Sequence, residues 1–167
     1  IAAGERVFEA LDTQSAVQEK EDATDLVDSK GHVRFENVSF SYSSTSPVLN
    51  NIDIDAPPGK IIALLGPTGS GKSTVVSLLP RFYDVTNGRI TIDGEDIREF
   101  KLDSLRSNIG TVQQDVFLFV GTLRDNIAYG RPGASQEEVE SAAKAARIHD
   151  FITSLPYGYD EWVGERG

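Results

Sequence analysis

The sequence predicts an α/β fold that is organised around a phosphate-binding loop. Residues 61–65 form an apolar run, and residues 66–73 directly after it read GPTGSGKS, which fits the pattern GxxxxGKS. Segments with alternating apolar residues lie on both sides of this unit, and helical repeats fill the C-terminal part. The order of strands, glycine-rich loop with its helix, further strands and then helices indicates a mixed α/β chain.

The glycine-rich loop has the composition that phosphate binding requires. Its glycines let the backbone approach an anion closely enough for several N–H groups to point at it, and the following helix offers its positive end to the same anion. In this motif the lysine, here Lys72, reaches the β and γ phosphates, and the hydroxyl of Ser73 binds Mg²⁺. The alternative is a glycine turn with an exposed lysine, but the buried-type strand before the loop favours nucleotide binding.

Length and composition limit the kind of protein. The chain has 167 residues, a length suited to one domain with a core, and its formal net charge is −10. Because nucleic-acid surfaces need clustered lysine and arginine, this charge argues against nucleic-acid binding. The absence of cysteine excludes disulfides and thiolate metal sites. The sequence has no run of about 18 apolar residues, so nothing in it is expected to span a membrane by itself. The chain begins with Ile1 and contains no methionine, so we expect a piece of a longer polypeptide.

The N-terminal part predicts a helix end, a linker and two strands. Helical spacing of apolar residues over 5–11 indicates a helix, and the polar, acidic residues 18–30 indicate a linker. In residues 33–42 the apolar positions alternate, but their phase flips near Asn37, which fits two strand pieces joined by a bulge. Residues 52–56 form another alternating strand, which Pro57, Pro58 and Gly59 end.

The middle part predicts further strands around the loop and its helix. Residues 60–65 lack alternation and are typical of a central parallel strand that is buried on both faces. A helix is expected over residues 73–79, directly after the loop. Residues 89–92 alternate as a strand, and Asp93 and Gly94 are a tight-turn signal. Residues 109–112 are a short strand candidate that leads into Gln113 and Gln114.

The C-terminal part predicts two helices. Ser135 and Glu138 form a capping box, and apolar residues at helical spacing follow between positions 139 and 146. Residues 148–155 repeat that spacing in a second helix, which ends before Pro156.

Two polar side chains at strand ends have chemical possibilities beyond the loop. The ring of Tyr42 is placed either to stack on a base or to pack as an ordinary aromatic of the sheet core. Gln114 follows a strand candidate, where an amide either touches Mg²⁺ and an attacking water or merely ends the strand. Spacing alone leaves both pairs of alternatives open.

The remaining titratable residues do not predict a catalytic or metal site. His32 and His149 have no partner at metal-ligand spacing, so we expect solvated or capping roles. Asp53 and Asp55 share a strand face that we expect to point to solvent. Nucleotide hydrolysis by a P-loop protein needs a second acidic strand end and a group that positions water. No apolar strand of four residues here ends in Asp, so the hydrolytic half of such a site is missing from this sequence.

Six segments, taken in order, resemble the nucleotide-binding domain of ABC transporters of the exporter type, in which the ATPase follows the transmembrane helices in one polypeptide. They are residues 35–42 (FENVSFSY), 66–74 (GPTGSGKST), 81–94 (RFYDVTNGRITIDG), 112–119 (VQQDVFLF), 121–130 (GTLRDNIAYG) and 163–167 (VGERG). The resemblance implies a partial P-loop NTPase core with an antiparallel β subdomain and the start of the ABC helical subdomain. It assigns residues 1–30 to the end of the last transmembrane helix and an acidic linker, 31–112 to the ATPase core, and 113–167 to the glutamine loop and the helical subdomain.

The resemblance also implies roles for individual residues. Tyr42 looks like the aromatic residue that stacks on adenine, and Gln114, rather than its neighbour Gln113, looks like the glutamine that senses Mg²⁺ and the γ-phosphate. Lys72 and Gln114 are then the catalytic residues of this part, and Ser73 and Gln114 hold Mg²⁺. ATP is expected to bind Tyr42 and the loop residues Gly66, Pro67, Thr68, Gly69, Ser70, Gly71, Lys72, Ser73 and Thr74.

The implied partners are the transmembrane domain of the same polypeptide and a second nucleotide-binding domain. The transmembrane domain is expected to contact the loop at Gln114 and the X-loop at residues 163–167, although Glu161 and Trp162 depart from the usual Thr and Glu. The second domain is expected to form a dimer and to supply an LSGGQ motif to the ATP site. This sequence itself contains no LSGGQ, Walker B glutamate, D-loop or switch histidine.

The resemblance therefore implies the ATP-binding half of the ATPase of an exporter, on the cytoplasmic face of a bacterial inner or plasma membrane. By itself this part is expected to bind Mg-ATP weakly and to hydrolyse it negligibly. One alternative is another P-loop protein such as a small-molecule kinase or a GTPase, against which the absence of an NKxD motif counts. The other is a non-hydrolytic nucleotide-binding or interaction fragment whose partner supplies the remainder.

Overall fold

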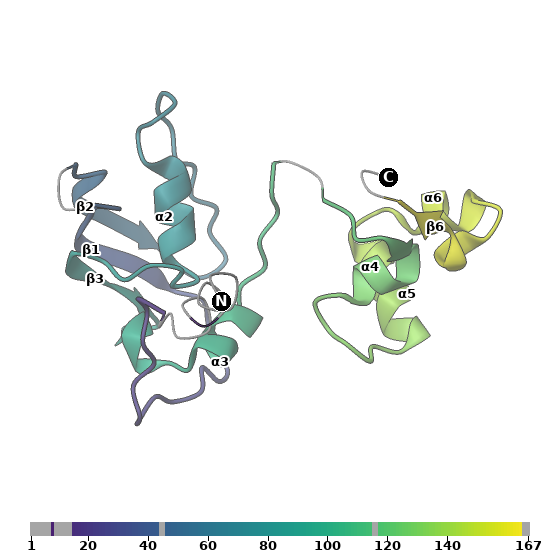
Figure 1. Ribbon diagram of the computed structural model, residues 1–167, viewed down its shortest axis with the longest axis horizontal. Helices are drawn as coiled ribbons and strands as arrows, with labels where there is room; N and C mark the ends of the chain where they lie inside the picture. The colour runs from purple at the N-terminus through teal and green to yellow at the C-terminus, as the bar shows by residue number, and fades with distance from the viewer. Residues whose placement is uncertain (1–7, 9–14, 44–45, 115–116, 165–167) are drawn as a thin grey trace. The chain divides into compact units, whose positions relative to one another are not determined.

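The computed structural model describes residue 8 and residues 15–43, 46–114 and 117–164. The chain divides into two compact units, Ile1–Thr111 and Val112–Gly167, and each is described by itself (Figure 1). The helix predicted over residues 5–11 lies outside the described residues apart from Phe8, and so do residues 165–167 of the predicted X-loop. Within the described ranges, no helix is long and apolar enough to cross a bilayer.

The first unit contains a four-stranded sheet in the order β2-β1-β3-β4, in which all neighbours are antiparallel. Its strands are β1 (Val33–Phe40), β2 (Leu49–Ala56), β3 (Asn87–Ile92) and β4 (Glu95–Asp96). Helix α2 (Lys72–Leu78) follows the glycine-rich loop and lies beside the sheet in Figure 1, and the 3₁₀ turn η1 (Ile97–Glu99) and helix α3 (Leu102–Ser107) complete the unit. The core contains Leu26, Phe35, Val38, Phe40, Leu49, Leu78, Ile90, Ile92, Ile97, Phe100 and Leu105. The predicted alternating strands and the helix after the loop are confirmed.

A bulge at Asn37 explains the change of phase in β1. Asn37 has a φ of +49°, and the pairing of β1 with β2 shifts register between Phe35 and Val38. Phe35 and Val38 are both buried in the core although they are three residues apart, because the extra residue turns the second half of the strand over. The Asp53 carboxylate, exposed as predicted, accepts a hydrogen bond from the backbone N–H of Asn37 at 2.9 Å and thereby caps the bulge.

The turn between β3 and β4 is the predicted tight turn. Asp93 and Gly94 have φ values of +54° and +93°, and Ile92 pairs with Glu95 across them. The Asp93 carboxylate also accepts backbone hydrogen bonds from Lys30 at 2.8 Å and from His32 at 3.0 Å. The His32 N–H, with further donors in residues 29–31, holds the pKa of the Asp93 carboxyl below its usual value of 3.8. Asp93 therefore fastens the chain just before β1 to the β3–β4 turn.

Two predicted strands are wrong. Residues 60–65 and 109–112 have no strand assignment, and Ile61 is 96% exposed and Val112 99% exposed. An apolar run becomes a buried parallel strand only when strands on both sides satisfy its backbone groups and helices cover its faces. The described residues pair no strand with either run, so the local pattern does not form the predicted structure.

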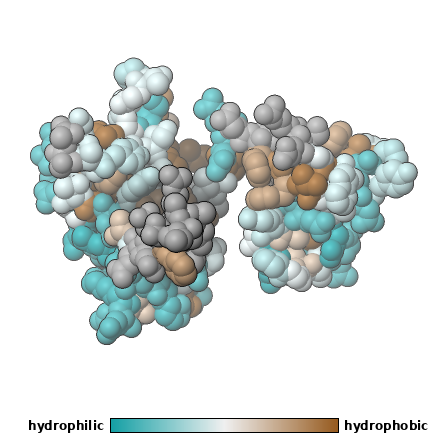
Figure 2. Space-filling view, viewed as in Figure 1, coloured by the Kyte–Doolittle hydropathy of each residue, from teal (hydrophilic) through white to brown (hydrophobic). Residues whose placement is uncertain are grey.

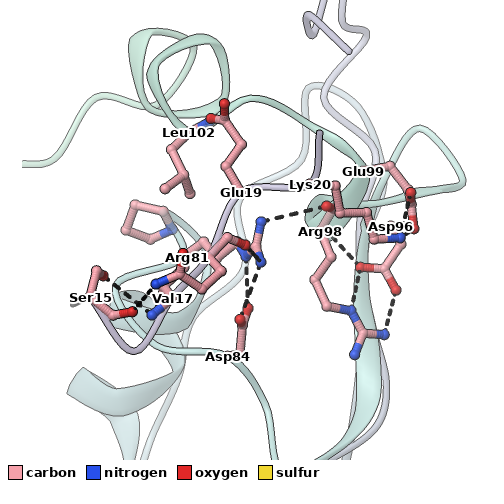
Figure 3. Close-up of polar contacts among 12 residues, drawn as sticks. Ser15, Val17, Glu19, Lys20, Arg81, Asp84, Asp96, Arg98, Glu99 and Leu102 are labelled. Atoms are coloured by element: carbon pink, nitrogen blue, oxygen red, sulfur yellow. Dashed lines mark hydrogen bonds and ion pairs between the residues drawn. The ribbon is translucent and has the colours of Figure 1, made fainter. Parts of the chain in front are cut away.

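The linker segment, residues 15–26, is held against the rest of the first unit (Figure 3). Thr24 forms a parallel bridge with Phe100, and its backbone exchanges hydrogen bonds with Glu99 and Lys101 at 2.9 and 2.8 Å. Arg81, which follows α2 and is buried, donates a hydrogen bond to the carbonyl of Gln18 at 2.8 Å. The prediction of a polar linker is thus incomplete, because its carboxylates and carbonyls have specific partners on the folded unit.

The second unit is mainly helical. It contains β5 (Gly121–Thr122), α4 (Leu123–Ala128), α5 (Gln136–Ala145), α6 (His149–Ser154), the 3₁₀ turn η2 (Gly158–Asp160) and β6 (Trp162–Val163), which pairs with β5. The predicted capping box is confirmed, since the N–H of Glu138 donates to the Ser135 hydroxyl at 3.3 Å and the N–H of Ser135 donates to the Glu138 carboxylate at 2.8 Å. The second predicted helix is α6. A small core of Val139, Ala143, Ile152 and Tyr159 holds these elements together.

Candidate nucleotide-binding site

The glycine-rich loop adopts a conformation that depends on its glycines. Gly69 and Gly71 have φ values of +85° and +88°, in the left-handed region that residues with a Cβ rarely occupy. At Gly71 a Cβ would also lie 2.6 Å from Cδ2 of Leu49 and 3.3 Å from the carbonyl oxygen of Val48. Gly71 is the N-cap of α2, and no side chain caps this end of the helix. The first-turn N–H groups of α2 are therefore left for another hydrogen-bond acceptor.

The Lys72 side chain folds back over its own loop. Its ammonium nitrogen, Nζ, donates to the carbonyl oxygens of Gly66 and Pro67, each at 2.7 Å, and to the hydroxyl of Ser70 at 3.3 Å. All three partners are exposed and neutral. Because hydrogen bonds between a cation and an ionised acceptor are stronger than those to a neutral carbonyl, a phosphate oxygen placed here competes well for this ammonium.

The other loop residues differ in exposure. Gly66, Pro67, Thr68, Gly69, Ser70 and Ser73 are exposed, whereas Thr74 is buried. Ser73 lies in the first turn of α2, and its backbone carbonyl accepts a hydrogen bond from Ser77 at 2.9 Å. Its hydroxyl is an oxygen donor of the type that Mg²⁺ prefers.

Tyr42 lies beside the beginning of the loop helix. Its hydroxyl is 3.2 Å from the hydroxyl oxygen of Thr74, and its ring is nearly perpendicular to those of Phe40 and Tyr83, at centroid distances of 4.8 and 5.1 Å. Tyr42 remains 55% exposed, so it is not the buried core aromatic that the alternative to base stacking predicts. The structure thus brings Tyr42 to the loop helix across 32 positions of sequence. The contact of Tyr42 with Tyr83 was missed by sequence reasoning, because Tyr83 belongs to a separate segment of the chain.

Gln114 is exposed at the start of the second unit, and its predicted role stays a prediction. The same unit exposes an aromatic patch of Phe117, Phe119 and Tyr129. The ring of Phe119 is edge-on to Phe117 at 5.0 Å and stacked on Tyr129 at 4.1 Å. Figure 2 shows apolar surface on the visible side of this unit. Exposed aromatic clusters of this kind are typical of contact surfaces.

The two histidines have structural partners. His32 Nε2 lies 2.6 Å from an oxygen of Asp55, and His149 Nδ1 lies 2.8 Å from the hydroxyl of Tyr159. Desolvation raises the pKa of the Tyr159 hydroxyl. Across the residues that the structure describes, no group of three or more His, Cys, Asp or Glu side chains is placed to hold a metal ion.

Comparisons with known proteins place these features in a family. The family model described as ABC transporter matches residues 49–160. Similar proteins include an uncharacterized ABC transporter ATP-binding protein, YwjA, of Bacillus subtilis, with 47% identity over the whole chain and 29% of its own length covered. The ATP-dependent lipid A-core flippase of Syntrophus aciditrophicus has 47% identity over the whole chain, with 28% of its length covered.

A solved structure of an ABC exporter is also similar to this chain. A bacterial Atm1-family ABC exporter with ATP bound has 45% sequence identity and a TM-score of 0.89, and the match covers 99% of this chain and 29% of that one. The chain therefore spans less than a third of the length of these relatives.

Proposed function

The chain belongs to the ABC transporter family, whose model matches residues 49–160 of the 167-residue chain, and we propose that it is the ATP-binding half of the nucleotide-binding domain of an exporter. The predicted family and the α/β fold class are confirmed by the family match and by the exporter structure at 45% identity. The kinase and GTPase alternatives are not supported, because the family is that of ABC transporters. In the intact polypeptide, ATP binding and hydrolysis would drive export of a substrate.

The observation that carries the proposal is the geometry of the loop. Gly69 and Gly71 give the loop its left-handed turns, and Lys72 Nζ lies within 2.7 Å of two loop carbonyls. We expect Lys72 to leave these neutral acceptors for the β and γ phosphates, while the backbone N–H groups of residues 68–74 surround the phosphate chain. Tyr42 would stack on adenine from its position beside Thr74.

The proposal includes Mg²⁺, and its protein ligands would be the side chains of Ser73 and Gln114. Both supply neutral side-chain oxygens, which suit a hard cation that also binds phosphate oxygens. Gln114 is in addition the proposed sensor of the γ-phosphate.

The proposed partners follow from the domain organisation. We assign residues 1–30 to the end of a transmembrane helix and its linker, 31–112 to the ATPase core, and 113–167 to the glutamine loop and the helical subdomain. The transmembrane domain of the same polypeptide would contact Gln114 and the X-loop from Val163 onward, and the aromatic patch at Phe119 is a suitable apolar surface. A second nucleotide-binding domain would supply LSGGQ, on the cytoplasmic face of a bacterial membrane.

Calorimetric titration of the 167-residue chain with Mg-ATP tests the proposal. We expect weak binding that Lys72→Ala abolishes, since the substitution removes the charged phosphate contact. Lys60→Ala is the matched control, because Lys60 is an exposed lysine just before the loop, and it should leave the affinity unchanged.

A phosphate-release assay on the same samples separates binding from hydrolysis. Negligible turnover is expected, because this sequence carries no Walker B glutamate. Robust turnover that Lys72→Ala abolishes would contradict the proposal that this chain is only the ATP-binding half. A non-hydrolytic interaction fragment would instead bind Mg-ATP and co-purify with a separate chain that carries LSGGQ.

A further inference from the structure

An aromatic cluster of Phe40, Tyr42 and Tyr83 lies at the loop helix. The ring of Tyr42 is nearly perpendicular to both neighbours, with interplanar angles of 85° to Phe40 and 89° to Tyr83. The rings of Phe40 and Tyr83 are themselves 5.6 Å apart. Perpendicular aromatic pairs at these distances are favourable, so the two neighbours restrict the orientation of the Tyr42 ring.

The two neighbours differ in what holds them. Phe40 ends β1 and is 4% exposed, so it belongs to the core. Tyr83 is 44% exposed and lies outside regular structure. Removing the Phe40 ring therefore disturbs the fold, whereas removing the Tyr83 ring leaves the core intact.

The backbone around Tyr83 is nevertheless fixed. Arg81 donates to the Asp84 carboxylate at 2.7 and 3.2 Å, which closes a loop around Tyr83, and both residues are drawn in Figure 3. The N–H of Phe82 donates to the carbonyl of Ser77 at 3.3 Å, in the last turns of α2. Tyr83 is thus tied to the end of the same helix whose beginning carries Lys72 and Thr74.

We propose that Tyr83 is a positioning residue that holds the ring of Tyr42 in the orientation required for stacking on the base of a bound nucleotide. The inference rests on the proposed function, because it presupposes that Tyr42 stacks on the base. Tyr42 receives three restraints, namely the Phe40 ring, the Tyr83 ring and the hydroxyl of Thr74. The residue still remains 55% exposed, so these restraints orient the ring without covering it.

The size of the effect follows from the number of side-chain orientations. Without Tyr83, the Tyr42 ring has at most about three staggered χ1 wells available instead of one, because Phe40 and Thr74 still restrain it. If one of these wells presents the ring to the base, the competent fraction falls to no less than about one third, and the apparent Kd for ATP rises by up to about threefold. A ligand that lacks a base gains nothing from the Tyr42 ring, so its affinity is expected to stay constant.

The test compares Mg-ATP with Mg-tripolyphosphate by calorimetry on the 167-residue chain. We expect Tyr83→Ala to weaken Mg-ATP binding by up to about threefold and to leave Mg-tripolyphosphate binding unchanged, while Tyr83→Phe keeps both affinities. Phe82→Ala is the matched control, since Phe82 is an adjacent exposed aromatic whose ring faces Arg106 at 5.4 Å. An unchanged ATP affinity in Tyr83→Ala, or an equal loss for tripolyphosphate, overturns the proposal.

A double-mutant cycle distinguishes positioning from direct contact. If Tyr83 acts through Tyr42, Tyr83→Ala has no further effect on Mg-ATP affinity in a Tyr42→Ala background. If the loss persists there, Tyr83 itself touches the nucleotide and the positioning proposal is overturned.

The same titrations separate this inference from the proposed function. Failure of Lys72→Ala to weaken Mg-tripolyphosphate contradicts the proposed phosphate site whatever Tyr83 does. If Lys72→Ala weakens both ligands but Tyr42→Ala weakens neither, the phosphate site stands and the positioning role of Tyr83 is overturned.

Discussion

Replacing Gly71 with alanine tests whether the glycine-rich loop is shaped by local backbone conformation alone or also by packing against the sheet. The φ of +88° at Gly71 costs a residue with a Cβ about 1–2 kcal/mol. The added Cβ would also lie 2.6 Å from Cδ2 of Leu49, a core residue, and overpacking of a core costs about 1–3 kcal/mol more. We therefore expect Gly71→Ala to destabilise the first unit by about 2–5 kcal/mol.

Gly69→Ala is the matched control for this prediction. Gly69 has a similar φ of +85°, but a Cβ there meets nothing within 4 Å, so only the backbone cost of about 1–2 kcal/mol applies. Amide hydrogen exchange of β1 in the absence of nucleotide measures both losses in the first unit. Fluorescence is less suitable, since the single tryptophan, Trp162, belongs to the second unit. Equal losses of protection in the two variants would refute the packing argument.

Three further substitutions test other parts of the structure. The lowered pKa of the Asp93 carboxyl stabilises the fold at pH values above its ordinary pKa of 3.8, and this contribution is lost as the pH falls through the lowered pKa. Hydrogen exchange of the amides of residues 30–32 should therefore rise over that pH range, and Asp93→Asn should remove this pH dependence. Arg81→Met should cost about 2 kcal/mol or more of stability and expose residues 15–26 to proteolysis, because the hydrogen bonds of a buried charged donor are lost. Lys20 is exposed, so the control Lys20→Met should cost only about 0–1 kcal/mol, and equal effects of the two substitutions on proteolysis would contradict this. Ser135→Ala should lower the stability of α5 by about 1 kcal/mol in thermal unfolding followed by circular dichroism, and an unchanged midpoint would argue against the capping box.

The sequence predicted features whose cause lies within a few residues. The bulge at Asn37 followed from a change in apolar phase, and the α5 capping box followed from two residues three positions apart. Each is decided by neighbouring side chains and backbone groups, so a local pattern contains the necessary information.

Features that depend on distant partners were missed. The sequence predicts that Glu19 is part of a polar linker, yet its carboxylate accepts a hydrogen bond from the N–H of Leu102 at 2.6 Å, at the beginning of α3. The two residues are 83 positions apart, and a surface carboxylate has no local signal that names such a partner. Tyr83 was missed for the same reason, since its contact with Tyr42 depends on how α2 ends.

The failure at residues 60–65 shows which part of the candidate site is independent of the predicted strand. An apolar run encodes a preference for burial, but hydrogen bonds to neighbouring strands are what make it a strand, and the described residues provide none. Immediately after this run, Gly69 and Gly71 still adopt left-handed conformations and Lys72 still reaches back to Gly66. The shape of the loop is therefore set by its glycines and by the packing of α2 on the sheet through Leu78, not by the strand before it. It follows that substitutions at Ile61 should leave the loop unchanged in this chain, whereas substitutions at Gly71 should not.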